Sequence, residues 1–521
     1  MTSTKPQQIT VQFQPSPSLP PQVASLAEAY ALLDKLVAGG ALQQALSLCE
    51  QLLPQQPQAI ALLWMKAYLQ ETLSTDMEER LAFCRRALQV DDSHIELSQM
   101  VGDLLRRLGR HREAIDWLLQ CSKRLGKSWQ IWLSLGQCYL EIGEGEQAVA
   151  ALRKTLKCNR HVAAAWFDLI GIAAFSRSDL TQMLATRKRK GLSLREMAHL
   201  DFSIAAYWRQ QGDVSRESQF LARANAAQRK ERPFDSAADQ QLLAEHLQHC
   251  DREYFQPIKA ALGASAPADE LRPIFIVGMP RCGSTLVERI LSSHSDVVAT
   301  GESSLVELSL SRSTARIGLV DHRPSMLPLL DEKSLQQFSS FYADQIAQTV
   351  ASARYTDKSL DNHRVIGLLL SCFPGARIID MQRHPLDIFL SCYQNAFYGV
   401  PYTNDLSAMA HYYIGYRKMM QHWQQCFDNP FIELHYEALV ADPEVGIRRL
   451  CSDCGLDWQP AMLDFHHQEG AVNTVSRAQV RKKMYRDSVA RWQPYRTLLQ
   501  PAIEILEREG FLPELPAKSG G

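Results

Sequence analysis

The chain has 521 residues, with 56 Lys or Arg against 57 Asp or Glu and a net charge of -1. This length exceeds what one hydrophobic core usually supports. The balanced charge argues against a protein that binds nucleic acids or membrane surfaces. No stretch stays apolar for the roughly 18 residues that a membrane span needs, and the first residues lack the apolar segment of a signal peptide. We therefore expect a cytoplasmic protein of two or three domains.

The first half of the chain has a helical pattern that repeats. Residues 1–25, rich in Pro, Gln and Ser, are predicted to be a disordered lead. Three pairs of small residues then recur at a spacing of 34: Gly102 and Gly136, Gly109 and Gly143, and Ala114 and Ala148. This is the period of tetratricopeptide repeats, in which helix pairs stack into a solenoid. We predict such an all-α domain over residues 26–258 and a linker over residues 259–272.

The second half, residues 273–521, alternates short apolar strands with helical stretches. The clearest strands cover residues 273–279, 376–382 and 430–436. This alternation predicts an α/β domain with a parallel sheet whose ligands bind beyond the carboxyl ends of the strands. The fold class expected for the whole chain is therefore an all-α solenoid followed by a P-loop-like α/β domain.

The first of these strands runs into a candidate phosphate-binding loop, "FIVGMPRCGSTLVERIL" at residues 275–291. Gly278 and Gly283 have the spacing of a nucleotide-kinase loop, but Ser284 stands in the lysine position and Thr285 in the magnesium-hydroxyl position. Backbone N–H groups at the start of the following helix favour an anion, and Arg281 supplies a cation inside the loop. The sequence thus predicts an anion site that is unsuited to triphosphate chemistry.

A second candidate anion site follows about a hundred residues later, in "IIDMQRHPLDIFLSCYQNAF". A strand ends at Arg383, turns at Pro385 and enters a helix that carries Ser391. An arginine and a serine across such a turn could hold one phosphate from two sides.

Together, these stretches resemble the sulfotransferases. The likeness is greatest to tyrosylprotein sulfotransferases and to bacterial proteins that fuse tetratricopeptide repeats to a sulfotransferase domain. Four further stretches match in order: "VVATGESS", "YTDKSLDN", "LHYEALVADPE" and "VSRAQVRKKMYRDSVARW". The resemblance implies 3'-phosphoadenosine 5'-phosphosulfate (PAPS) as the sulfuryl donor. This donor has no triphosphate to require a loop lysine, and its 3'-phosphate requires a second anion site.

The resemblance also implies the roles of the donor-binding residues. The 5'-phosphosulfate would be held by Arg281, Gly283, Ser284 and Thr285, and the 3'-phosphate by Arg383 and Ser391. Tyr436 would lie near the adenine or the bridging phosphate, and Ser476 at the leaving side of the donor. Arg491 stands where the tyrosylprotein enzymes have lysine, so a phosphate contact is expected there with a different geometry.

The catalytic residues implied by the resemblance are Glu302, Arg281 and Lys358. Glu302 would accept the proton of the acceptor hydroxyl, and Arg281 and Lys358 would neutralise charge on the sulfuryl group. His384 is the rival base, although its place in "RHP" indicates that it shapes the turn. No metal is expected, because neither Cys451 with Cys454 nor the adjacent histidines after Phe465 have partners at ligand spacing.

The sequence therefore predicts a PAPS-dependent sulfotransferase, with tyrosine in a peptide or protein as the favoured acceptor. We expect the tetratricopeptide repeats to engage that acceptor polypeptide, without nucleic acid or a membrane span, and an oligomer stays open. Two alternatives also stay open. The acceptor could be a carbohydrate, lipid or small metabolite, or the second domain could be an inactive nucleotide-binding scaffold beside protein-binding repeats.

Overall fold

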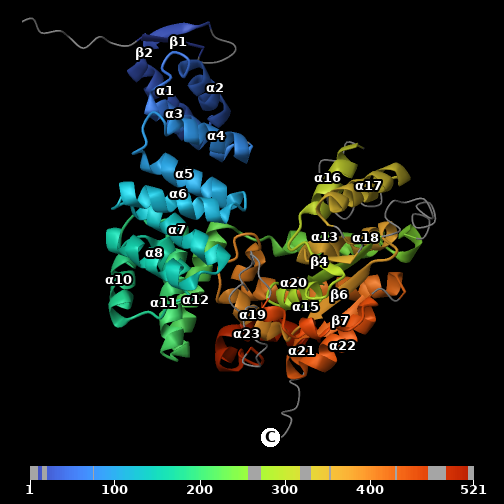
Figure 1. Ribbon diagram of the computed structural model, residues 1–521. Coiled ribbons are helices and arrows are strands. Elements are labelled where there is room, and N and C mark those ends of the chain that lie inside the picture. The colour runs from blue at the N-terminus through green and yellow to red at the C-terminus, as the bar shows by residue number, and fades with distance from the viewer. Residues whose placement is uncertain are drawn as a thin grey trace, which may run out of the picture. The chain divides into compact units, whose positions relative to one another are not determined.

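The computed structural model describes residues 10–14, 20–73, 76–255, 271–316, 330–350, 352, 354–428, 431–467 and 488–513 (Figure 1). The chain divides into two compact units, Met1–Ala174 and Phe175–Gly521. Among the described residues, no helix is both long enough and apolar enough to cross a membrane.

Unit 1 is a stack of antiparallel helix pairs (Figure 1). Its helices are α1 (Leu26–Ala38), α2 (Leu42–Leu52), α3 (Ile60–Thr72), α4 (Met77–Ala87), α5 (Ile95–Arg107), α6 (His111–Arg124), α7 (Trp129–Ile142), α8 (Gly145–Cys158) and α9 (Ala163–Asp168). The first helix of each successive pair begins 34 or 35 residues after the previous one, as the bounds of α1, α3, α5, α7 and α9 show. The predicted repeat period is therefore confirmed in this unit.

The repeated glycines mark the places where the two helices of a pair cross. A Cβ atom at Gly102 on α5 would lie 2.6 Å from Leu118 Cδ2 on α6. The equivalent atom at Gly136 on α7 would lie 2.8 Å from Leu152 Cδ2 on α8. Only glycine allows this approach without displacing the leucine, which explains why glycine recurs at the helix period.

A two-stranded antiparallel hairpin precedes the helices, formed by β1 (Thr10–Phe13) and β2 (Gln22–Ser25). Val11 and Phe13 are buried in the same apolar cluster as α1 and α2. The Gln55 side chain after α2 accepts a hydrogen bond from the Gln12 N–H at 2.9 Å. The prediction of a disordered lead is therefore wrong for these two segments, because alternate side chains of β1 cover the end of the first repeat.

Unit 2 contains a five-stranded parallel sheet. Its strands are β3 (Arg272–Gly278), β4 (Val297–Ala299), β5 (Arg354–Asp357), β6 (Arg377–Gln382) and β7 (Phe431–His435). They are ordered β4-β5-β3-β6-β7, and all pairs are parallel. The predicted α/β fold is therefore confirmed. Because the chain order reverses on either side of β3, the carboxyl end of this strand is the expected ligand site.

Unit 2 has two groups of helices: one precedes the sheet in the chain, and the other alternates with its strands. Those before the sheet are α10 (Arg177–Arg187), α11 (Leu194–Gln210), α12 (Val214–Glu231) and α13 (Ser236–His249). Those within the sheet region are α15 (Ser284–Ser292), α16 (Leu305–Arg316), α17 (Glu332–Thr349), α18 (Ile366–Cys372), α19 (Pro385–Tyr393), α20 (Leu406–Cys426), α21 (Tyr436–Ala441), α22 (Pro443–Cys454) and α23 (Arg496–Arg508). The short 3-10 helices are η3 (Leu360–Val365), η4 (Pro401–Asn404), η5 (Pro460–Met462), η6 (Phe465–His467) and η7 (Gln493–Tyr495).

Helices α10 to α13 belong to the same compact unit as the sheet, not to the repeat unit. Glu217 on α12 is fully buried and accepts hydrogen bonds from Gln394 Nε2 at 2.9 Å and from the Tyr495 hydroxyl at 2.6 Å. The Asn225 side chain donates to the Tyr393 carbonyl at 2.8 Å. These buried polar contacts join α12 to the sheet-bearing part of unit 2, and the compact units divide at residues 174 and 175. Residues 259–270 of the predicted linker lie outside the described residues, so that boundary stays a prediction.

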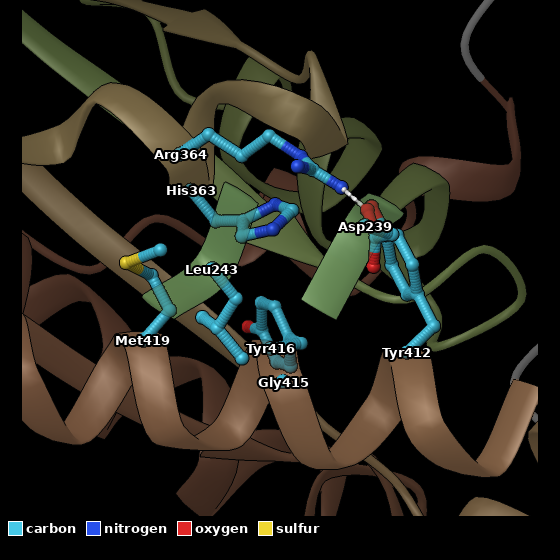
Figure 2. A pocket seen from close by; sticks show the side chains of 8 residues that line it. All are labelled: Asp239, Leu243, His363, Arg364, Tyr412, Gly415, Tyr416 and Met419. Atoms are coloured by element: carbon cyan, nitrogen blue, oxygen red, sulfur yellow. Dashed lines mark hydrogen bonds and ion pairs between the residues drawn. The ribbon is translucent and has the colours of Figure 1, made fainter. Parts of the chain in front are cut away.

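A small cavity of about 20 Å³ lies between α13, η3 and α20 (Figure 2). Arg364 donates to Asp239 at 2.7 Å at its edge, and the His363 ring packs edge-on against Tyr416. Burial lowers the pKa of His363 to about 4, so this ring is neutral at pH 7. The cavity has room for about one water molecule and shares no residue with the predicted site, so we assign it to packing of α13.

Candidate active site

The loop between β3 and α15 contains residues in the left-handed region of backbone conformation. Arg281 adopts a left-handed conformation, with φ of 70°, which is uncommon for a residue with a side chain. Gly283 has φ of 106°, and a Cβ atom there would lie 2.7 Å from the Tyr436 ring. Glycine is therefore required at residue 283 by both its conformation and its close neighbour.

Helix α15 begins directly after Gly283, at Ser284. Ser284 and Thr285 are each 7% exposed, so the first turn of this helix is buried. The N–H groups of a first helical turn have no partner within the helix, and they attract an anion together with the helix dipole. The phosphate position predicted from the sequence falls at this turn, at the carboxyl end of β3.

The two predicted anion sites adjoin each other. Arg281 Nε donates to Ser391 Oγ on α19 at 2.8 Å. Arg383, which follows β6, donates through Nη1 to the Arg281 carbonyl at 2.8 Å and through Nη2 to the Ser488 carbonyl at 2.6 Å. Within the part of the chain that the structure describes, the buried Nε atom of Arg383 has no hydrogen-bond partner. A buried donor of this kind is costly unless a ligand meets it.

The Tyr436 ring, at the start of α21, connects these elements. It is 8% exposed, and the Arg383 guanidinium lies 4.5 Å from its centroid. The same ring faces Gly283, as described above. Tyr436 therefore supports Arg383 from one side through a cation–π contact and the loop glycine from the other.

Glu302 and Lys358 form an ion pair at the neighbouring strand ends. Lys358 Nζ lies 2.9 Å from Glu302 Oε1. The segment after β4 is aligned with the segment after β5, because the Thr300 N–H donates to the Thr356 carbonyl at 3.1 Å and the Lys358 N–H donates to the Gly301 carbonyl at 3.0 Å. Glu302 is 57% exposed and Lys358 is 1% exposed, so the carboxylate lies at the surface of the site and the ammonium beneath it.

A third charged residue, Glu288, lies behind this pair. It stands one helical turn after Ser284 on α15 and is 7% exposed. Glu288 Oε1 accepts from the Gly301 N–H at 3.0 Å, and Glu288 Oε2 lies 3.7 Å from Lys358 Nζ. Our sequence analysis missed this residue, although its spacing of four from Ser284 puts both on one helix face.

His384 is held in a structural role. Its Nδ1 atom accepts from the Leu386 N–H at 3.3 Å as the N-cap of α19, and its ring stacks on Trp492 at 5.3 Å. Burial, followed by the neighbouring Arg383 charge, lowers the pKa of His384 to about 4. These contacts agree with the prediction that His384 shapes the turn.

The segment from Ser488 to Trp492 lies against the start of α19. The buried Asp387 carboxylate accepts from the Ala490 N–H at 2.7 Å and from the Trp492 N–H at 3.0 Å. Arg491, between these two residues, is exposed. Ser476 lies outside the described residues. Of the predicted site residues, the structure thus joins Arg281, Gly283, Arg383, Ser391 and Tyr436 in one cluster and Glu302 with Lys358 in an adjoining pair.

Two regions of the chain match known families. Residues 273–460 match the sulfotransferase family. Residues 74–155 match the family described as anaphase-promoting complex, cyclosome, subunit 3. The two matches fall on the sheet-bearing part of unit 2 and on the helical repeats of unit 1, respectively.

Individual proteins are similar to this chain over different lengths. An uncharacterized protein of Aquifex aeolicus (strain VF5) is 29% identical over 418 residues, which cover 78% of this chain and 54% of that protein. Protein-tyrosine sulfotransferase 1 of Danio rerio is 27% identical over 225 residues, which cover 40% of this chain and 60% of that protein. Each match spans less than two thirds of the relative. The solved sulfotransferase domain from the Synechococcus PCC 7002 olefin synthase is 20% identical, with a TM-score of 0.36, and the match covers 48% of this chain and 98% of that domain.

Proposed function

Because residues 273–460 form a sulfotransferase-family domain, we propose that this chain transfers a sulfuryl group from PAPS to a hydroxyl acceptor, with tyrosine in a peptide or protein as the favoured acceptor. The observation that supports this proposal most is the buried Nε atom of Arg383, which has no hydrogen-bond partner among the described residues and lies beside the Arg281–Ser391 contact. A donor with two separated anionic groups fits this arrangement, since the α15 N-terminus takes one group and Arg383 with Ser391 takes the other.

The residues of the site have separate roles in the proposed reaction. When bound, PAPS supplies an activated sulfuryl group and a bisphosphate leaving group. The first turn of α15 and Arg281 orient the phosphosulfate end, while Arg383 and Ser391 fix the 3'-phosphate end. Positioning and charge stabilisation of this kind account for most of the catalysis in related phosphoryl transfers.

Glu302 and Lys358 act on the acceptor side. Glu302 accepts the proton of the acceptor hydroxyl as the new oxygen–sulfur bond forms and the bond from sulfur to the phosphate oxygen breaks. The Lys358 ammonium neutralises negative charge on the transferring group. A tyrosine hydroxyl has a pKa of about 10 in water, so at neutral pH a base in this position is needed.

Two observations favour a polypeptide acceptor. The relatives from Danio rerio and Drosophila melanogaster carry the name protein-tyrosine sulfotransferase, at 27% and 26% identity. Unit 1 has tetratricopeptide-type helix pairs, and stacked pairs of this kind present an extended surface suited to peptide segments. We propose that unit 1 binds the acceptor polypeptide and so raises its concentration near the catalytic unit.

Substitution of Arg383 by Ala tests the donor assignment. We expect the affinity for adenosine 3',5'-bisphosphate to fall by roughly tenfold to a hundredfold, because a charge-assisted contact is worth about 1.5–3 kcal/mol. Calorimetric titration measures this change. An analogue without the 3'-phosphate, adenosine 5'-phosphosulfate, should lose much less affinity.

The controls separate recognition from folding. Arg112→Ala removes an exposed arginine that pairs with Glu144 in unit 1, and it should leave bisphosphate binding unchanged. Arg383→Lys keeps the charge but loses the planar fork, so its affinity should lie between the wild type and the alanine variant. Equal or tighter binding of magnesium-ATP by the wild type would contradict the donor assignment.

A further inference from the structure

Behind the ion pair of Glu302 and Lys358 lies a carboxylate with no role in the mechanism above. Glu288 is 7% exposed and Lys358 is 1% exposed, so both charges are removed from water. Buried charges of this kind persist only when they are paired and hydrogen-bonded. The question is therefore why Lys358, which already pairs with Glu302, has a second carboxylate beside it.

The contacts of Glu288 suit an ionised carboxylate. Its Oε1 atom accepts from the Gly301 N–H at 3.0 Å and from the Thr356 hydroxyl at 3.4 Å. Its Oε2 atom faces Lys358 Nζ at 3.7 Å. Burial raises the pKa of the Glu288 carboxyl, while the Lys358 charge and the Gly301 N–H oppose that rise. Among the described residues, the hydrogen-bond and ion-pair partners of Glu288 are donors or a cation, as an ionised carboxylate requires.

The charges around Lys358 come from three elements. Glu288 approaches from α15, and Glu302 approaches from the segment after β4. Asp357 precedes Lys358 at the end of β5, but its carboxylate accepts from the Ser359 N–H, Asn362 Nδ2 and the Tyr342 hydroxyl. In the described part of the chain, the carboxylates paired with the ammonium are therefore Glu288 and Glu302.

These two carboxylates differ in what happens to them during the proposed reaction. Glu302 becomes neutral when it takes the proton of the acceptor hydroxyl, so its attraction for Lys358 is lost at that moment. Glu288 is buried beside Lys358 and takes no proton in this step, so it keeps its charge. A buried ammonium left without a counterion is strongly unfavourable and tends to lose its proton.

We propose that Glu288 is a positioning residue that keeps Lys358 charged and in place while Glu302 takes up the acceptor's proton. The inference rests on the proposed function for the identity of that proton and of the group that Lys358 neutralises. Glu288 also holds the Gly301 N–H, so it sets the position of the turn that carries Glu302. It contributes both through charge and through this hydrogen bond.

The test replaces Glu288 by Gln, which preserves shape and an oxygen for the Gly301 N–H but removes the charge. We expect kcat to fall about tenfold or more, with KM for the donor nearly unchanged. The alkaline limb of the pH–rate profile should move to lower pH by about one unit, because an opposite charge within about 4–6 Å favours the charged form by that amount or more. Glu288→Asp restores a negative charge and should move the limb back toward its wild-type position.

A matched control is Glu217→Gln, which is the same change at a fully buried, ion-paired glutamate on α12. Its alkaline limb should match the wild type, even if its melting temperature falls. A Glu288→Gln variant with lower kcat at every pH and an unmoved limb would overturn the proposal, since that pattern indicates only a structural role.

A second measurement does not depend on sulfuryl transfer. NMR of protein labelled at lysine Cε, with the Lys358 signal assigned through Lys358→Arg, follows the protonation of this lysine directly. The proposal expects Lys358 to lose its proton at lower pH in Glu288→Gln than in the wild type. An identical titration in both proteins overturns the inference. A titration difference between the two proteins, found together with a wild type that transfers no sulfuryl group, would contradict the proposed function instead.

Discussion

Replacement of Glu302 by Gln is expected to lower kcat by a factor of at least about a hundred while leaving the affinity for adenosine 3',5'-bisphosphate unchanged. The amide preserves the shape of the side chain but cannot accept the proton of the acceptor hydroxyl. The bisphosphate is proposed to contact the loop before α15 and Arg383, which are separate from Glu302. Steady-state rates with a tyrosine peptide and calorimetry with the bisphosphate measure the two quantities independently.

The matched control is Glu307→Gln, five residues later on α16, where the glutamate is also exposed. It should retain wild-type rates. If Glu302→Gln retained near-normal turnover at neutral pH, Glu302 would not be the base. His384 is the rival that the sequence offers, but its cap on α19 and its stacking on Trp492 leave it poorly suited to that task.

Two truncations are expected to behave very differently. Removal of residues 1–174 takes away unit 1 and should leave a soluble protein that binds the bisphosphate. Removal of residues 1–230 also takes away nearly all of α12, including the fully buried Glu217 and Asn225. The deletion leaves Gln394, Tyr495 and the Tyr393 carbonyl without these partners, at a cost of about 1–3 kcal/mol each, against a typical total stability of about 5–15 kcal/mol. The longer deletion should therefore abolish cooperative folding.

Thermal unfolding and bisphosphate binding of the two variants check this expectation. If the longer deletion were as stable as the shorter one, α12 would not belong to the catalytic unit. The shorter deletion also tests the role of the repeats. It should raise KM for a protein acceptor several-fold and leave turnover of a short tyrosine peptide unchanged. Equal KM for the protein acceptor with and without residues 1–174 would remove the repeats from acceptor binding.

Local patterns in the sequence predicted the parts of the fold that depend on local physics. The apolar run before Gly278 became β3, and the glycines at residues 102 and 136 marked helix crossings. The hairpin was missed because the alternation around Val11 and Phe13 is only four residues long within a Pro-rich and Gln-rich stretch. Helix periodicity also does not reveal which neighbour a helix packs against, so α12 was assigned to the repeats.

The site was predictable where a motif is contiguous. Arg281, Gly283 and Ser284 lie in one loop, and Arg383 and Ser391 flank one turn, so their grouping followed from the spacing. Glu288 could not be recognised in this way, because its partners Gly301 and Lys358 come from separate segments that are joined only by the sheet order. The clamp of Asp387 on the N–H groups of Ala490 and Trp492 is equally non-local.

The most direct test of the central claim is mass spectrometry of tyrosine peptides after incubation with PAPS and the full chain. The account predicts that the mass of one sulfuryl group is added at a tyrosine, with one adenosine 3',5'-bisphosphate formed for each peptide modified, and that Glu302→Gln nearly abolishes both. Modification of a carbohydrate, lipid or small metabolite but of no peptide would contradict the tyrosine assignment. Absence of acceptor-dependent bisphosphate formation with every acceptor class would contradict sulfuryl transfer itself.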